Sequence, residues 1–326
     1  MADISLLPQE FLERLEKLYS SEELKAVKQS FTTDKPVSFR VNSLKASTSE
    51  VLELFKAKQL SVTPVPWYPD SFIYEGAKTD LTSLPEYREG KFYIQGLSSM
   101  IPALVLNPRP SEKVLDIAAA PGSKTTQIAT LMNDSGELVA NDISRTRIYK
   151  LKDNLKQQGV TNATVLNQPG ERLWRKYPEY FDKVLVDAPC SMEGRISTFD
   201  PDSYKDWSVK KVKELSHRQE YLLRSAITAT KVGGTIVYST CTLAPEENEG
   251  VIDWILAKEG DAIELEEIQM TGLKLQPGLT EWNGKQFKQE VKKTARVRPD
   301  DQMEGFFVAK IRKTKTTLKP ELFQKS

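Results

Sequence analysis

Hydrophobic and polar positions fall into a regular rhythm from Lys113 onward. Five short runs rich in β-branched and aliphatic residues predict strands, at 113–118, 137–143, 163–168, 183–188 and 235–240. Stretches with the apolar spacing of a helix lie between and after them, at 123–132, 145–158, 208–231 and 245–259. This alternation predicts a parallel sheet with helices on both faces.

Two further strand candidates follow, at 262–268 and 304–311, without a clear crossover pattern. They bring the expected number of strands in this sheet to seven. The pattern does not determine whether the last strand runs parallel or antiparallel to the others. Seven strands are one more than the six of the dinucleotide-binding fold.

The N-terminal region shows a different pattern. Residues 9–30 predict one helix, because their apolar residues fall roughly on one face. A strand is expected at 36–42 and a helix at 49–59, ahead of an extended, proline-rich segment at 61–72. Segments in this order predict a small α+β domain, which we place at residues 1–95.

The rest of the chain is expected to form a second domain at 96–313 and a basic tail at 314–326. Residues 285–326 carry twelve Lys or Arg against five Asp or Glu, although the net charge of the whole chain is only +1. Such a basic region favours contact with phosphate groups, although a solvated surface is the commoner meaning of a lysine cluster.

Composition excludes several classes of protein. The 326 residues are 39% hydrophobic and 28% charged, as in a globular protein rather than a disordered one. No apolar run approaches the ~20 residues that span a bilayer. The N-terminus lacks the basic start and apolar stretch of a secretory signal, so we expect a cytoplasmic protein, and a monomer. The single histidine, His217, argues against a histidine-built metal site, and no metal is expected.

A turn of small residues connects the first strand of the regular region to its helix. The turn reads Asp116-Ile-Ala-Ala-Ala-Pro-Gly-Ser-Lys-Thr125. In open α/β sheets a ligand binds outside the carboxyl ends of the strands, where small residues let the backbone approach it. Asp142 ends the second strand, 20 residues after Gly122. A carboxylate at this position can accept hydrogen bonds from ribose hydroxyls.

Two other interpretations of this turn fail. In a phosphate-binding Walker loop with Gly122 as its second glycine, the first glycine is replaced by Ile117, and Ser123 precedes Lys124 where the lysine should follow Gly122 directly. A dinucleotide fingerprint requires three glycines, and Gly122 is the only one present. A turn without any ligand is the remaining alternative, and Asp142 makes it the lesser one.

The only two cysteines follow the fourth and fifth predicted strands. Cys190 lies in Asp187-Ala-Pro-Cys-Ser191 and Cys241 in Ser239-Thr-Cys-Thr242. For a single free cysteine, a small buried hydrophobic residue would be the favoured interpretation. Two cysteines at equivalent strand ends instead predict that both belong to an active site at this edge of the sheet.

A pair of thiols suits methyl transfer to carbon better than to nitrogen or oxygen. Nitrogen and oxygen acceptors have a lone pair, whereas carbon-5 of cytosine becomes nucleophilic only after a thiolate adds to carbon-6. The adduct also requires a hydrogen bond or proton at N3, for which Asp187 is well placed. The Asn-Pro-Pro-aromatic motif of N-methyltransferases is absent from the sequence.

These motifs resemble those of the Nol/Nop/Sun family of RNA cytosine-C5 methyltransferases, and most of all the bacterial 16S ribosomal RNA methyltransferases of the F type. The similar segments are SFRVNSLK (38–45), FYIQGLSSMIPALVLNP (92–108), VLDIAAAPGSKTTQIA (114–129), DAPCS (187–191), YSTCTLAPEENE (238–249) and EGFFVAKIRK (304–313). The resemblance covers nearly the whole chain. It implies a seven-stranded, doubly wound, Rossmann-like methyltransferase sheet and an RNA-recognition-like N-terminal domain.

The resemblance also implies the cofactor, the substrate and the role of each site residue. The cofactor is S-adenosylmethionine (AdoMet) and the substrate is RNA, with ribosomal RNA ahead of transfer RNA. Cys241 is implied as the nucleophile and Cys190 as the group that assists product release. The implied AdoMet contacts are Ala118, Ala119, Ala120, Pro121, Gly122, Ser123, Lys124, Asp142, Arg147 and Asp187.

The target cytosine has to leave its stack to meet a cysteine, and contacts to the surrounding RNA must supply the energy. We expect these contacts from Arg40, Lys288, Lys292 and Lys293. A solvated surface for the lysines and a structural ion pair for Arg40 are the alternatives.

The sequence departs from the family pattern at two positions. Pro169 stands where the family usually has an acidic residue for the adenine amino group, and Gly96 stands where an acidic residue often follows Gln95. Two other functions stay open as alternatives. One is a DNA cytosine-C5 methyltransferase, in which the Pro-Cys cysteine would be the nucleophile. The other is a catalytically silent RNA-binding or ribosome-assembly factor.

Overall fold

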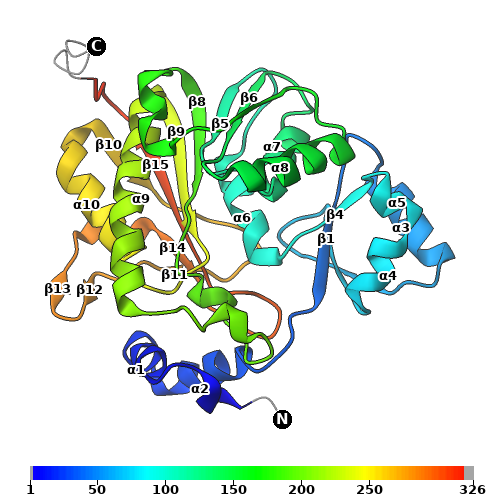
Figure 1. Cartoon of the computed structure of the whole chain (residues 1–326), viewed down its shortest axis with the longest axis horizontal. Helices are drawn as coiled ribbons and strands as arrows, with labels where there is room; N and C mark the ends of the chain where they lie inside the picture. Colours follow the sequence, from blue (N-terminus) through cyan, green and yellow to red (C-terminus); the bar gives the residue numbers. More distant parts are fainter. Residues whose placement is uncertain (1–2, 319–326) are drawn as a thin grey trace.

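Two sheets form the framework of the molecule (Figure 1). The computed structural model describes residues 3–318, so the end of the predicted basic tail, 319–326, lies outside the described residues. The larger sheet has nine strands in the order β11-β14-β15-β9-β8-β5-β6-β7, with β10 also paired to β15, and the smaller has the order β2-β3-β1-β4. Among residues 3–318, no helix is long and apolar enough to cross a membrane.

The strands have the following bounds. The small sheet consists of β1 (Val37–Val41), β2 (Val62–Pro64), β3 (Ser71–Tyr74) and β4 (Phe92–Ile94). The large sheet consists of β5 (Lys113–Asp116), β6 (Glu137–Asn141), β7 (Ala163–Leu166), β8 (Phe181–Asp187), β9 (Thr230–Thr240), β10 (Ile263–Glu266), β11 (Gln276–Pro277), β14 (Ala295–Val297) and β15 (Phe306–Lys313). A separate hairpin consists of β12 (Glu281–Trp282) and β13 (Lys285–Gln286).

The helices fall into two groups along the chain. Those of the N-terminal region are α1 (Gln9–Leu18), α2 (Ser21–Ser30), α3 (Thr48–Ala57), α4 (Lys78–Ser83) and α5 (Pro85–Arg88). Those around the large sheet are α6 (Leu97–Leu106), α7 (Ser123–Leu131), α8 (Arg145–Gln158), α9 (Val209–Ala229) and α10 (Glu249–Glu259). Short 3-10 turns include η3 (Glu193–Arg195) and η6 (Gln289–Lys293).

The centre of the large sheet is parallel, as the sequence predicts. Strands β5, β6, β7, β8 and β9 run in the same direction, and β15 runs antiparallel to β9. The sheet contains two more strands than expected, β14 and β11, because β14 pairs with β15 and β11 pairs with β14. The strand expected at 262–268 is β10, which also pairs with β15. With two and three residues, β11 and β14 are too short to produce a recognisable alternation in the sequence.

Both faces of the parallel strands are covered by helices, with α9 and α10 on one side and α6 and α7 on the other (Figure 1). Successive residues point to opposite faces of a strand. Accordingly, Leu115 and Ile236 pack with the α9–α10 side, whereas Val114 and Val237 pack with the α6–α7 side. Because both faces are buried, these strands read as continuous apolar runs.

The prediction of one helix over residues 9–30 is wrong. Tyr19 ends α1 in an extended conformation, with φ −124° and ψ 146°. Ser20 then begins α2 with a capping box, in which its hydroxyl accepts from the Glu23 amide and the Glu23 side chain accepts from the Ser20 amide. This reciprocal cap favours a new helix start over continuation through Ser20.

Helices α1 and α2 do not pack with the small sheet, and in Figure 1 they lie below the large one. Phe11 and Phe31 share a cluster with Ile196 and Leu243, which lie in the loops after β8 and β9. The small sheet has its own core of stacked aromatic rings, including Phe39 and Phe72.

Candidate active site

The two cysteines lie side by side at the carboxyl edge of the parallel strands. Strands β8 and β9 are neighbours, with Asp187 opposite Ser239, so the loops that follow them leave the sheet together. The Sγ atoms of Cys190 and Cys241 are 3.3 Å apart, and both residues are half-buried free thiols. The contact with Cys241, together with burial, raises the pKa of the Cys190 thiol well above its ordinary value.

A cavity of about 590 Å³ opens at this edge and has the size of a small-molecule site. Both cysteines and Asp187 line it. The N-terminal region contributes the segment from Tyr93 to Gly96. Of the residues predicted to hold the cofactor, the wall contains Ala118, Ala120, Pro121, Ser123, Lys124, Arg147 and Asp187.

The remaining predicted cofactor residues, Ala119, Gly122 and Asp142, shape the cavity from behind its wall. Gly122 precedes α7 with φ +109°, a conformation that L side chains rarely adopt. A Cβ atom there would also lie 2.9 Å from the Leu151 Cδ1 atom. The small-residue turn therefore depends on glycine both for its backbone conformation and for its packing against α8.

Asp142 is 3% exposed, and its carboxylate already has partners. It accepts from the backbone amides of Ala120, at 3.1 Å, and Ser144, at 2.8 Å. The Arg147 Nη1 atom lies 3.6 Å away, and the Arg147 side chain is 51% exposed.

Lys124 joins the small-residue turn to the cysteine side of the cavity. Its Nζ atom donates to the Asp187 Oδ2 atom and to the Ser99 hydroxyl, each at 2.8 Å. The Asp187 Oδ1 atom accepts from the Ser239 hydroxyl at 2.9 Å. These contacts hold both oxygens of Asp187 in place beside the thiols.

Asp116, at the end of β5, is a buried acid near Lys124 and Asp187. Asp116 accepts from the Thr125 hydroxyl at 2.7 Å, while its Oδ1 atom is buried without a hydrogen-bond partner. Burial raises the pKa of Asp116 to about 7.

Sequence reasoning missed two charged residues at the mouth of the cavity. The Arg195 Nε atom donates to the Glu304 Oε1 atom at 3.2 Å, and the carboxylate of Glu304, together with the two cysteines, raises the pKa of Arg195. Arg195 follows Cys190 in the same loop, which is a usable signal because loops at this edge carry function. Glu304 has no such signal, since only the antiparallel pairing of β15 with β9 brings it here.

Glu304 also lies beside Gly96, the position where the sequence departs from the family pattern. A Cβ atom built at Gly96 would lie 3.8 Å from the Glu304 Oε2 atom. An acidic group therefore does occupy the space next to Gln95, although it comes from a distant part of the chain. At the other departure, Pro169 is exposed and offers no carboxylate.

The predicted RNA contact of Arg40 is wrong. The side chain is completely buried and stacks over the Tyr93 ring. Its Nε atom donates to Gln95 at 2.9 Å, and its Nη2 atom donates to the Ser123 carbonyl and the Thr126 hydroxyl, at 3.1 and 2.7 Å. Arg40 therefore ties β1 to the start of α7 through neutral acceptors, and it is not the ion pair named as its alternative either.

The three predicted RNA-binding lysines are exposed on or beside η6, away from the cavity. Lys293 donates to the Leu265 carbonyl on β10. Leu265 pairs with Ile311 on β15, and Ile311 pairs with Ile236 on β9. Ile236 is five residues before Cys241. At about 3.3 Å per strand residue, Ile236 lies roughly 16 Å from Cys241 along the strand direction. A contact of these lysines with RNA stays a prediction, and it would be remote from the reacting base.

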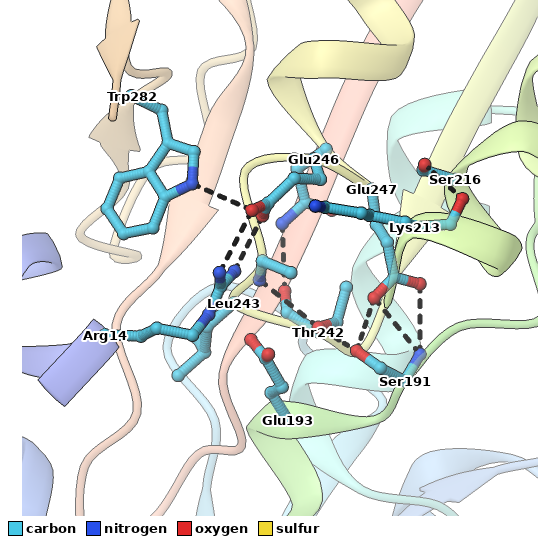
Figure 2. A network of polar contacts seen from close by, with 12 residues as sticks. Arg14, Ser191, Glu193, Lys213, Ser216, Thr242, Leu243, Glu246, Glu247 and Trp282 are labelled. Atoms are coloured by element: carbon cyan, nitrogen blue, oxygen red, sulfur yellow. Dashed lines mark hydrogen bonds and ion pairs between the residues drawn. The ribbon is translucent and has the colours of Figure 1, made fainter. Parts of the chain in front are cut away.

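A buried polar network, shown in Figure 2, supports the loops that carry the cysteines. Glu246 and Glu247 are consecutive but reach in different directions. Glu246 pairs with Arg14 on α1, at 2.6 and 3.0 Å, and accepts from Trp282. Glu247 accepts instead from Ser191, the residue after Cys190.

Two family models match this chain. One, described as 16S rRNA methyltransferase RsmB/F, covers residues 103–312. The other, described as the N-terminal domain of 16S rRNA methyltransferase RsmF, covers residues 7–96.

Known relatives extend these matches. The chain is 41% identical over 306 residues to the tRNA (cytosine(49)-C(5))-methyltransferase of Pyrococcus abyssi, covering 93% of this chain and 95% of that protein. It is 39% identical over 322 residues to the ribosomal RNA small subunit methyltransferase F of Vibrio campbellii, but spans only 65% of that relative's length. A methyltransferase homologue from Pyrococcus horikoshii has a similar crystal structure, with a TM-score of 0.78, 34% identity and coverage of 94% and 100% of the two chains.

Proposed function

Because the chain belongs to the RsmB/F family of 16S rRNA methyltransferases, we propose that it transfers a methyl group from AdoMet to carbon-5 of a cytosine in RNA. The observation that carries this proposal is the pair of thiols, 3.3 Å apart, in the same cavity as the small-residue turn. A methyltransferase for nitrogen or oxygen acceptors would need neither thiol.

The residues present fit AdoMet. The turn offers small side chains and a left-handed glycine at the carboxyl edge, where such ligands bind. Ala118 through Lys124 would hold the cofactor along the turn, and Asp142, Arg147 and Asp187 would bind its polar groups. AdoMet supplies the methyl group and leaves as S-adenosylhomocysteine.

In the proposed reaction the Cys241 thiolate adds to carbon-6 of the cytosine. The electron pair released at carbon-5 forms the bond to the methyl group. A base then removes the carbon-5 proton, and the bond between Cys241 and carbon-6 breaks, which regenerates the thiolate and restores the ring. Asp187, held by Lys124 and Ser239, would orient the base by accepting from its N4 amino group.

Cys190 assists the release step in this proposal. Its raised pKa keeps it as a thiol at neutral pH, and its position lets that thiol donate to the Cys241 sulfur. A donor at this place stabilises the departing thiolate, because hydrogen bonds to a charged acceptor are the stronger ones.

Ribosomal RNA is the first substrate class we propose, since both family models carry that description. Transfer RNA is the second, since this chain covers 95% of the archaeal tRNA methyltransferase but only 65% of the Vibrio rRNA methyltransferase.

The purified chain incubated with methyl-labelled AdoMet and either 16S ribosomal RNA or transfer RNA tests the proposal. Nucleoside mass spectrometry should find the label in 5-methylcytidine of one substrate, and a Cys241→Ser control should transfer none. RNA binding without methyl transfer would favour the silent assembly factor. A parallel reaction contains DNA in place of RNA, and label found only there would favour the DNA methyltransferase.

A further inference from the structure

A buried glutamate connects the two cysteine loops. The Glu247 side chain is fully buried, and it accepts from the Ser191 amide at 3.0 Å and from the Ser191 hydroxyl. The Ser191 Oγ atom also lies 2.7 Å from the Thr242 Oγ1 atom. Either hydroxyl can donate in this second hydrogen bond.

The two bridging residues directly follow the two cysteines. Ser191 is bonded to Cys190, and Thr242 is bonded to Cys241. Figure 2 shows Ser191 between Thr242 and Glu247, so this chain of hydrogen bonds connects the two loops directly after the cysteines. None of these three residues lines the cavity.

Glu247 is itself held by the rigid framework. On α9, Gln219 donates to the Glu247 Oε2 atom at 2.7 Å and to the Pro189 carbonyl, just before Cys190, at 2.8 Å. On β9, the Tyr238 hydroxyl donates to the Glu247 backbone carbonyl at 2.6 Å. Glu247 thus connects both cysteine loops to α9 and β9.

We propose that Glu247 is a positioning residue that sets the separation of the Cys190 and Cys241 sulfur atoms, acting through Ser191 and Thr242. Only the catalytic consequence of this arrangement rests on the proposed function. The separation of the thiols is a property of the protein alone, and it is measurable without RNA or AdoMet.

Glu246 provides a matched control for a general loss of stability. It is the adjacent glutamate, it is partly buried, and its side chain bonds Arg14 and Trp282 rather than Ser191 or Thr242. Removal of either glutamate leaves buried donors unsatisfied and destabilises the fold. Only removal of Glu247 should change the separation of the Cys190 and Cys241 sulfur atoms.

The first test is a redox titration of the whole protein with glutathione. Two thiols give two electrons and two protons to one glutathione disulfide, which yields a Cys190–Cys241 disulfide and two glutathione molecules. Close thiols favour this reaction through a high effective concentration. Glu247→Ala should lower the equilibrium constant for the protein disulfide by about ten-fold or more, whereas Glu246→Ala should leave it within about two-fold of wild type.

A second pair of variants keeps the test decisive if Glu247→Ala does not fold. Thr242→Val removes the bridging hydroxyl without changing the side-chain shape, and Thr242→Ser retains that hydroxyl. Thr242→Val should lower the same equilibrium constant, and Thr242→Ser should restore it. Wild-type values for Thr242→Val, or for a folded Glu247→Ala, would overturn the proposal.

Methyl transfer adds the catalytic readout. Thr242→Val should lower kcat by about ten-fold or more while the AdoMet dissociation constant stays within about two-fold of wild type, because the turn that holds AdoMet lies on β5 and α7. A kcat that stays at the wild-type value while the redox constant falls would overturn the catalytic consequence. If the wild-type protein methylates no RNA, the proposed function fails, while the redox result still decides the positioning role.

Discussion

The Nζ atom of Lys124 lies 2.8 Å from the Oδ2 atom of Asp187, and this ion pair joins the start of α7 to the end of β8. The lysine side chain is 9% exposed and the carboxylate 30%. One end of the pair belongs to the turn that we assign to the cofactor, and the other lies three residues before Cys190. The pair therefore couples the two halves of the proposed active site.

A double-mutant cycle with Lys124→Met and Asp187→Asn should measure this coupling. Each single substitution leaves a partly buried partner unpaired, so the double variant should be less destabilised than the sum of the two. We expect a coupling free energy of about 1–2 kcal/mol, reduced by the exposure of the carboxylate. Urea unfolding gives the values, and additive effects would mean that the pair contributes nothing.

The two cysteine variants should fail at different steps. Cys241→Ala removes the nucleophile, so neither methyl transfer nor a covalent RNA adduct should form. Cys190→Ala should instead accumulate an RNA–protein adduct that survives a denaturing gel, because the departing thiolate loses its donor. An adduct formed by Cys241→Ala and none formed by Cys190→Ala would reverse the two roles.

Asp142→Ala should weaken AdoMet binding by about ten- to a hundred-fold. The substitution removes the acceptor for the ribose hydroxyls and also frees the Ala120 amide that fixes the turn. Asp142→Asn is the matched control, because its carbonyl oxygen can still accept from that amide, so its loss of affinity should be smaller. Isothermal titration calorimetry with unchanged affinity for Asp142→Ala would remove this residue from the cofactor site.

Replacement of Lys288, Lys292 and Lys293 together by Ala should flatten the salt dependence of RNA affinity. Each lost contact with a single-strand phosphate should remove about 0.7 from the slope of log K against log salt. Arg40→Met is the contrasting variant, since its buried guanidinium should affect the unfolding midpoint and leave the slope unchanged. An unchanged slope in the triple variant would return the lysines to a solvated surface.

Glu247 should make stability depend on pH in a defined window. Burial raises the pKa of Glu247 from an ordinary 4.5 to about 8. Below pH 4.5 the carboxyl is protonated in both the folded and the unfolded chain, and between 4.5 and about 8 only the unfolded chain releases the proton. Rising pH therefore favours unfolding across this window, and the contribution is lost once the pH passes about 8.

The comparison of wild type with Glu247→Gln isolates this contribution, because the other titrating groups cancel. The unfolding free energy of wild type minus that of the variant should fall between pH 5 and 8, by at most about 1.4 kcal/mol per unit. The difference should then stay constant above this range. Urea unfolding at several pH values measures it, and a difference that is constant throughout would contradict the raised pKa.

Local patterns in the sequence were sufficient for the framework and for the location of the site. The apolar runs predicted the parallel strands, since strands covered on both faces must be continuously apolar. Parallel strands end at one edge, so the motifs at Asp187, Cys190 and Cys241 had to meet there. The glycine in the turn after β5 was also readable, because few other residues adopt its backbone conformation.

Only the tertiary structure decided which side chains these residues contact. Arg40 reads as a basic residue available to RNA, yet it is buried under α7, and Glu304 reaches Gly96 only through the pairing of β15 with β9. Glu246 and Glu247 are identical in type and adjacent in sequence, but one pairs with α1 and the other holds the cysteine loops. Such contacts join residues far apart along the chain, so they depend on strand register and helix docking, which local hydrophobic periodicity does not specify.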